Sequence, residues 1–206
     1  MGALTREVEL VKQEFSREQE CLKVDLQKAL STEVSYRDEV RNALIHYYAM
    51  VSEWIYATLE VGFGNYTKDN IDALVQARMK IASFYASAGV AKSKVTFLTD
   101  NKEIRLLAHD LYCAVLTFYH WTDTEFLKLQ HNCENLKSIQ DQFIRATAEP
   151  DQDKNVIKDV NARSEQLLGE RKQLIDHYMA NMNDQYKLVL PVENEFSTKV
   201  KTYLKT

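Results

Sequence analysis

The sequence predicts an all-α protein, an elongated antiparallel bundle of long, kinked helices. Two observations support this prediction: residues that interrupt helices are scarce, and apolar residues recur at alternating spacings of three and four. The 206 residues include only five Gly and two Pro, about 3% of the chain against roughly 12% in an average protein. So few turn-forming residues leave little room for the many turns that an all-β or α/β fold needs.

Residues 3–61 form the first predicted rod. The apolar stripe of its first half consists of Leu4, Val8, Val11, Phe15, Leu22, Leu26 and Leu30. The stripe frays across residues 31–39 and resumes from Val40 to Leu59, so the frayed stretch is either a kink or a turn. We expect a turn at Gly62–Thr67, because two glycines and an asparagine within four residues tolerate positive φ angles.

Residues 68–148 form the second predicted rod, which contains two sustained seams. The first consists of Leu74, Ala77, Ile81, Phe84, Ala88, Ala91, Val95 and Leu98. The second consists of Ile104, Ala108, Leu111, Val115, Phe118, Thr122, Glu125, Leu129, Asn132, Leu136, Ile139 and Phe143. Such seams are typical of helices that pack at a shallow angle, as in bundles and coiled coils. The seams are out of phase, and Asp100–Glu103 between them has the spacing of a capping box, so residues 99–103 are either a kink or a turn.

Residues 152–205 form the third predicted rod. A turn at residues 148–153 separates it from the second, because Pro150 disfavours the helical conformation of Glu149. Pro191 predicts a kink, since apolar spacing resumes at Val192. The chain is therefore three long rods if the uncertain breaks are kinks, or five to six helices if they are turns.

We expect one helical-bundle domain over residues 1–206, with its exposed seams completed by a second copy. The helical pattern runs from Leu4 to Leu204, which predicts a domain excised from a larger protein. Small residues surround Gly89 within the second rod. A glycine inside a helix costs about 1 kcal/mol relative to alanine, so we expect a close approach between helices there.

The chain lacks the residue patterns of common catalytic and metal sites. None of the five histidines has a glutamate three residues before it, which argues against a di-iron bundle. His109 and Cys113 could form half of a zinc site, but no second pair has matching spacing. All three cysteines (Cys21, Cys113 and Cys133) are interpreted as small core residues. We therefore predict a protein that is not an enzyme and that uses no metal or cofactor.

Charge and cysteine usage limit the possible partners and the compartment. The net charge of −4 gives no general attraction to nucleic acid or to an anionic membrane. No stretch reaches the roughly 20 apolar residues of a membrane span, and the N-terminus lacks the apolar core of a signal peptide. An odd number of cysteines without a CxxC pair favours reduced thiols. These observations together predict a cytoplasmic protein.

Aromatic residues carry the remaining functional signal. Of 21 in the chain, 15 fall between Tyr36 and Phe126, and adjacent pairs must point to different faces of a helix. The surplus rings fill a thick core, line a small-molecule pocket, or form a surface for self-association or a protein partner. The interface candidates are Tyr47, Tyr48, Trp54, Tyr56, Tyr119 and Trp121. If they form an interface, truncating Trp54 or Trp121 should weaken association without unfolding the chain.

The leading functional hypothesis is a non-catalytic interaction or scaffolding module that binds itself or a protein partner. Three long kinked helices also resemble, in architecture alone, the crescent-shaped BAR domains, which implies a membrane-shaping dimer. The acidic turn with Glu149, Asp151 and Asp153 counts against a membrane-binding tip. A second alternative is the ligand-sensing bundle of a receptor, which needs flanking membrane spans.

Overall fold

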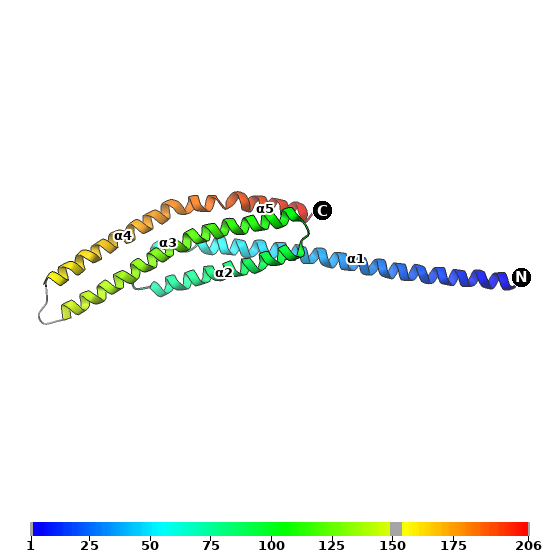
Figure 1. Ribbon diagram of the computed structural model, residues 1–206, viewed down its shortest axis with the longest axis horizontal. Helices are drawn as coiled ribbons and strands as arrows, with labels where there is room; N and C mark the ends of the chain where they lie inside the picture. The colour runs from blue at the N-terminus through cyan, green and yellow to red at the C-terminus, as the bar shows by residue number, and fades with distance from the viewer. Residues whose placement is uncertain (1, 149–153, 206) are drawn as a thin grey trace. The chain divides into compact units, whose positions relative to one another are not determined.

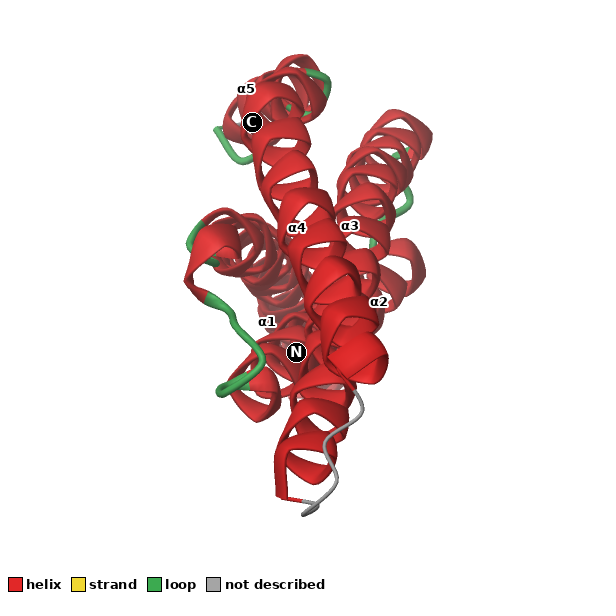
Figure 2. Cartoon of the chain, turned by 90° about the vertical axis from the view of Figure 1, so that its left-hand side faces the viewer, coloured by secondary structure: helices red, strands yellow, loops and turns green. Residues whose placement is uncertain are grey.

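The computed structural model describes residues 2–148 and 154–205, and for residues 2–16 and 18 it describes the backbone alone. The long elements are α1 (Gly2–Leu59), α2 (Ile71–Leu98), α3 (Lys102–Ala148), α4 (Lys154–Lys187) and α5 (Leu190–Tyr203), and a short 3₁₀-helix, η1 (Phe63–Asn65), follows α1. Short loops join the helices, and no strand occurs among the described residues (Figure 2). The predicted all-α helical bundle is confirmed.

The chain divides into two compact units, Met1–Ala43 and Leu44–Thr206. We call the first the N-terminal segment and the second the bundle. The described part of the N-terminal segment is a single stretch of α1, and the helix continues through residues 31–39, where the sequence left open a kink or a turn. Residues 31–39 contain neither Gly nor Pro, so nothing in them forces the backbone out of the helix. The single domain over residues 1–206 stays a prediction.

Within the bundle, α3 is the central helix. It contacts α2, α4 and α5, and Trp54 from the last turns of α1 packs on Tyr112 and Tyr119 of α3. Figure 1 shows that the direction alternates from α1 to α4 within the bundle, while α5 continues in the direction of α4, so that both follow one another along α3. The bundle is thus an antiparallel arrangement built around one helix.

The predicted seams of the second rod lie in the core. Every seam position of α3 from Ile104 to Ile139 is buried, including the polar residues Thr122, Glu125 and Asn132. In α2 the buried seam residues are Leu74, Ile81, Ala88, Ala91 and Val95. The helix α3 also buries Phe126 and Cys133 beside the seam, because it has neighbours on several sides.

The turn predicted at Gly62–Thr67 is confirmed as the loop that contains η1, but its predicted cause is wrong. No described residue, glycine included, has a positive φ. The turn closes instead through the Asn65 amide, which donates to the Gly62 carbonyl at 2.9 Å. The Asn65 side chain lies where a Cβ on Gly62 would be. Gly62 therefore serves close approach rather than an unusual backbone angle.

The remaining breaks have different outcomes. Residues 99–101 form a true turn, and Asn101 caps α3 by accepting the Ile104 amide at 3.1 Å, one residue later than the predicted box. Near Pro191, α4 ends at Lys187 and α5 begins at Leu190, so the predicted kink is a short interruption. The turn predicted at residues 148–153 lies largely outside the described residues.

The close approach predicted at Gly89 exists, but a side chain makes it. A Cβ on Gly89 would lie 3.2 Å from the Tyr112 hydroxyl. The ring of Tyr112, from α3, also lies under the Lys92 ammonium at 4.7 Å. Gly89 therefore makes room for Tyr112 against α2.

Candidate functional site

The aromatic interface candidates lie mostly inside the bundle. Trp54 is fully buried. The centroid of its ring lies 5.4 Å from that of Tyr85, 5.7 Å from that of Tyr112 and 5.6 Å from that of Tyr119. We call these four residues the Trp54 cluster. Tyr47 is also fully buried, and its hydroxyl donates to the Ala108 carbonyl at 2.6 Å. A partner could reach Trp54 and Tyr47 only if the bundle opened.

The other candidates differ in exposure. Tyr48 is half-buried and donates its hydroxyl to Glu193 Oε1 at 3.2 Å. Trp121 is half-buried too, stacked on Tyr178 with ring centroids 5.3 Å apart. Tyr119 is half-buried in the Trp54 cluster, and Tyr56 alone among the six candidates is exposed, at 62%. These rings chiefly build the core, which was one of the three interpretations of the aromatic surplus.

A second aromatic cluster was not predicted from the sequence. Phe63 of η1 stacks on Tyr178 of α4 with centroids 4.1 Å apart, and on Phe126 of α3 at 5.4 Å. Both Phe63 and Tyr178 are buried. The available signal was a lone phenylalanine between two glycines, a position where a turn residue can insert into a core.

Two buried polar residues of α3 lie near this cluster and along the same seam. Glu125 accepts from Lys128 at 2.7 Å through Oε1, while Oε2 has no partner in the described part of the chain. Burial, followed by the charge of Glu125, raises the pKa of Tyr178 to about 12. Asn132 donates to the Leu167 carbonyl at 2.9 Å and so links α3 to α4. Such buried polar contacts fix the alignment of neighbouring helices.

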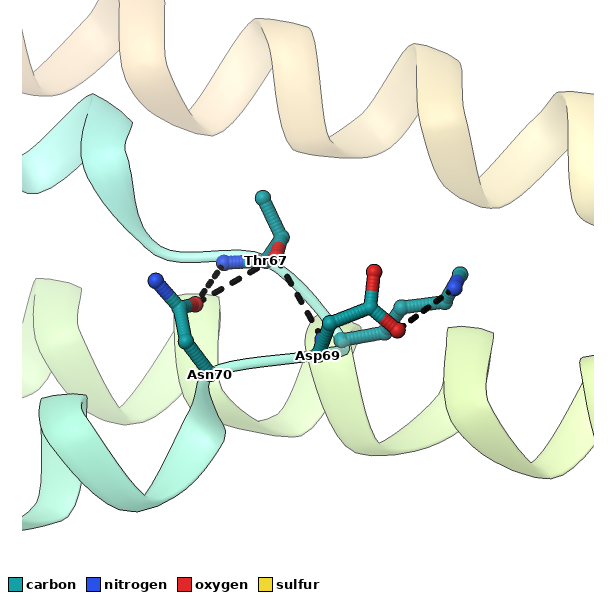
Figure 3. A network of polar contacts seen from close by, with 4 residues as sticks. Thr67, Asp69 and Asn70 are labelled. Carbon is teal, nitrogen blue, oxygen red and sulfur yellow. Dashed lines mark hydrogen bonds and ion pairs between the residues drawn. The ribbon is translucent and has the colours of Figure 1, made fainter.

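The loop before α2 is held by its own polar network (Figure 3). The Thr67 amide donates to Asn70 Oδ1 at 2.6 Å, and the Asp69 amide donates to Thr67 Oγ1 at 3.3 Å. From α4, Arg171 Nη2 donates to the carbonyls of Gly64 and Tyr66, at 3.1 and 2.6 Å. Arg171 therefore fastens the loop to α4.

A cavity of about 450 Å³ lies beside this loop, between the C-terminal part of α3 and the first half of α4. Aliphatic and aromatic side chains of the two helices line it together with polar ones, and the charged residues Lys68, Asp69 and Arg171 line it as well. The sequence did not point to this cavity, because α3, α4 and the loop come together only in the folded chain.

The His109–Cys113 pair exists but gathers no further metal ligands. Cys113 Sγ lies 3.6 Å from His109 Nε2, and Lys92 Nζ lies 3.2 Å from His109 Nδ1. No group of three potential ligands occurs among the described residues. Cys21 and Cys113 are exposed, so their prediction as core residues is wrong, whereas buried Cys133 confirms it. Cys113 lies two residues after the buried Leu111, which places it on nearly the opposite side of α3.

The N-terminal segment carries a row of exposed apolar side chains, which we call the leucine row. It consists of Leu22, Leu26, Leu30 and Val34, with exposed fractions of 62, 58, 66 and 53%. A shallow groove runs between this row and a parallel row formed by Gln19, Lys23, Gln27 and Ser31. The sequence placed Leu22, Leu26 and Leu30 on an apolar stripe and predicted that a second copy completes the exposed seams; the structure leaves the three side chains exposed.

Comparison of the chain with protein-family models, curated proteins and solved structures finds no match. Function must therefore be argued from the geometry above. No helix in the described ranges has both the length and the apolar character that crossing a bilayer requires. The expectations of no catalysis, no metal and no cofactor stay predictions.

Proposed function

We propose that this chain is a non-catalytic interaction module that self-associates by packing the leucine rows of two copies against each other. The observation that supports the proposal is the exposure of more than half of each of the four aliphatic side chains. Contiguous apolar surface on a helix usually marks a contact with another macromolecule. The charge of the chain disfavours nucleic acid and anionic membranes as that macromolecule.

The N-terminal segment needs a covering partner to be stable as a helix. Its described part is one stretch of α1 with no second element packed on it inside the segment. Most helical stability in proteins comes from packing of an apolar face, because a helix in water gains little from its own hydrogen bonds. A second copy supplies that packing without any additional component.

The spacing of the leucine row fits helix–helix packing. Residues four apart form a ridge on a helix, and the commonest packing class interdigitates such ridges from two helices at a crossing angle of about −50°. The groove between the leucine row and the Gln19–Ser31 row is the complementary feature. One copy therefore offers both a ridge and a groove to the other.

An antiparallel two-fold arrangement is also complementary in charge. Centred on Lys28, it places Leu22 of one copy opposite Val34 of the other, and Leu26 opposite Leu30. The same centre places Lys23 at the level of Glu33 of the other copy. Each contact thus occurs twice in the dimer, once from each copy, as a two-fold interface requires. Four aliphatic side chains per copy make an interface at or below the low end of the usual range of about 1,200–2,000 Å², so we expect weak, concentration-dependent association.

The substitution Leu26→Lys should weaken this association at least about tenfold, or roughly 1.4 kcal/mol, because it places a charge at the centre of the apolar contact. Val24→Lys is the matched control: Val24 is also exposed, at 47%, but lies on nearly the opposite side of the same helix. Sedimentation velocity across about three decades of concentration measures both dissociation constants. Circular dichroism verifies that helix content is unchanged.

A charge exchange tests the antiparallel alignment. Lys23→Glu and Glu33→Lys should each weaken association, since each places like charges together, and the double variant should restore it. A chain that stays monomeric at every concentration contradicts the proposal, as does an equal effect of Leu26→Lys and Val24→Lys. If the double variant does not recover association, the antiparallel alignment is contradicted, but self-association through the leucine row is not.

A further inference from the structure

The cavity between α3, α4 and the loop at Thr67–Asp69 has the size of a small-molecule site. Its volume of about 450 Å³ falls within the range of roughly 300–1,000 Å³ that is typical of ligand pockets. All residues that line it belong to the bundle, and none belongs to the leucine row.

The apolar part of the cavity wall forms a trough, and Gln140, Asn161 and Ser164 line the cavity beside it. The side chains that build it are Leu136, Ile139 and Phe143 from α3, and Val160 and Leu168 from α4. Leu136 and Phe143 are seven residues apart, which gives the trough a length of about 10 Å at the helical rise. Leu168 and Phe143 remain exposed although they line it. The trough therefore presents uncovered hydrocarbon surface.

One end of the trough carries an uncompensated positive charge. Arg171 uses Nη2 for the carbonyls of Gly64 and Tyr66, its Nε is buried without a partner, and no carboxylate of the described residues pairs with it. Burial is the largest cause of the raised pKa of the nearby Cys133 thiol, whereas its contact with Arg171 lowers that pKa. Lys68 also lines the cavity, but its ammonium pairs with Asp69 at 2.7 Å. The charged residues that line the cavity, Lys68, Asp69 and Arg171, together carry one positive charge.

A shielded guanidinium without an anion is costly, and an anion that reaches it removes that cost. Arg favours carboxylates because its N–H groups match their geometry. A single net charge suits a monoanion better than a phosphate dianion, which would also face the Asp69 carboxylate at the rim. Chain-like hydrocarbon matches the shape of the trough.

We infer that this cavity binds an amphipathic carboxylate, with the carboxylate at Arg171 and an unbranched hydrocarbon chain along the trough between α3 and α4. The carboxylate lies near the loop at Thr67–Asp69, and the chain extends toward Phe143 and Val160. The ligand class is thus a medium-chain fatty acid or a molecule of the same chemistry. No residue of the N-terminal segment takes part.

Isothermal titration calorimetry with decanoate tests the inference directly. We expect saturable binding of one decanoate per chain. Decan-1-ol has the same chain and a neutral head, and it should bind at least about tenfold more weakly, which corresponds to roughly 1.4 kcal/mol. Decyltrimethylammonium has a cationic head and should not bind in the cavity. Equal affinity for decanoate and decan-1-ol would overturn the role of Arg171.

Variants separate the cavity from other apolar surfaces. Ser164→Trp fills the cavity from α4 and should abolish decanoate binding, whereas the control Ser87→Trp on the exposed side of α2 should leave it unchanged. Arg171→Lys keeps the positive charge but loses the planar N–H geometry, so its affinity for decanoate should lie between those of the wild type and Arg171→Met. Arg171→Met should lose about tenfold or more if circular dichroism shows it folded. Unchanged decanoate binding in Ser164→Trp would refute the site, whatever the variants of the leucine row show.

Discussion

The substitution Trp54→Ala should lower the free energy of unfolding by about 3–5 kcal/mol. Trp54 is fully buried, and its ring contacts Tyr85, Tyr112 and Tyr119. Removing it leaves a cavity where three helices meet. A domain is typically stable by about 5–15 kcal/mol, so the variant loses a large share of its stability.

Urea denaturation followed by far-UV circular dichroism measures this loss as a lower midpoint with an unchanged slope. Tyr56→Ala is the matched control, because Tyr56 lies on the same helix two residues later and is exposed. We expect it to change stability by less than about 0.5 kcal/mol. Equal midpoints for the two variants would show that the Trp54 cluster does not hold the bundle together. The sequence predicted that this truncation would weaken association without unfolding, and full burial of Trp54 now favours the opposite result.

Alkaline pH should destabilise the bundle steeply between about pH 10 and 12. Burial is the largest cause of raised pKa values at Tyr47, Tyr48, Tyr66, Tyr112, Tyr119, Tyr178 and Tyr186. For Tyr112 and Tyr178 the pKa rises to about 12. Below about pH 10 these phenols are protonated in both the folded and the unfolded chain. Above it the unfolded chain loses protons that the folded chain keeps, so the free energy of unfolding falls until the folded pKa is reached.

The substitution Tyr178→Phe should reduce this alkaline loss by roughly 2–3 kcal/mol, since a pKa difference of one unit corresponds to about 1.36 kcal/mol. The hydroxyl of Tyr178 has no partner in the described structure, so its removal breaks no hydrogen bond. Urea midpoints measured at several values from about pH 8 to pH 12 test the effect. Tyr56→Phe serves as the exposed control. An identical pH profile for wild type and Tyr178→Phe would contradict the assignment.

The seam of α3 was predictable position by position because its cause is local. A spacing of three and four places Glu125 and Asn132 on the buried face, and both are buried there. The uncertain breaks needed more than spacing. Residues 99–101 form a turn, in which Asn101 caps the start of α3. Residues 31–39 instead continue as helix, because they contain no residue that breaks one.

The functional residues were harder to predict because their surroundings come from distant parts of the chain. Trp54 appears as a surplus ring in the sequence, and only the positions of Tyr85 and Tyr119 show that it is enclosed. The charge of Arg171 is unremarkable in the sequence. Its significance depends on the loop carbonyls that it binds and on its buried Nε, which has no hydrogen-bond partner among the described residues. The sequence showed the leucine row as part of a stripe, and its exposure agrees with the expectation that a chain of this kind leaves seams uncovered.

Arg171 of α4 holds the loop that precedes α2, and this contact between distant parts of the chain has a consequence for biosynthesis. Arg171 follows Tyr66 by 105 residues, and Glu193 follows its partner Tyr48 by 145. At roughly 5–20 residues per second, a ribosome needs on the order of 5–20 s to make the chain between Tyr66 and Arg171, whereas helices form in about a microsecond. The first helices therefore emerge with Phe63 and the faces that α3 and α4 later cover still open to water. Nascent chains of this protein should depend on chaperones that shield apolar surfaces during that interval.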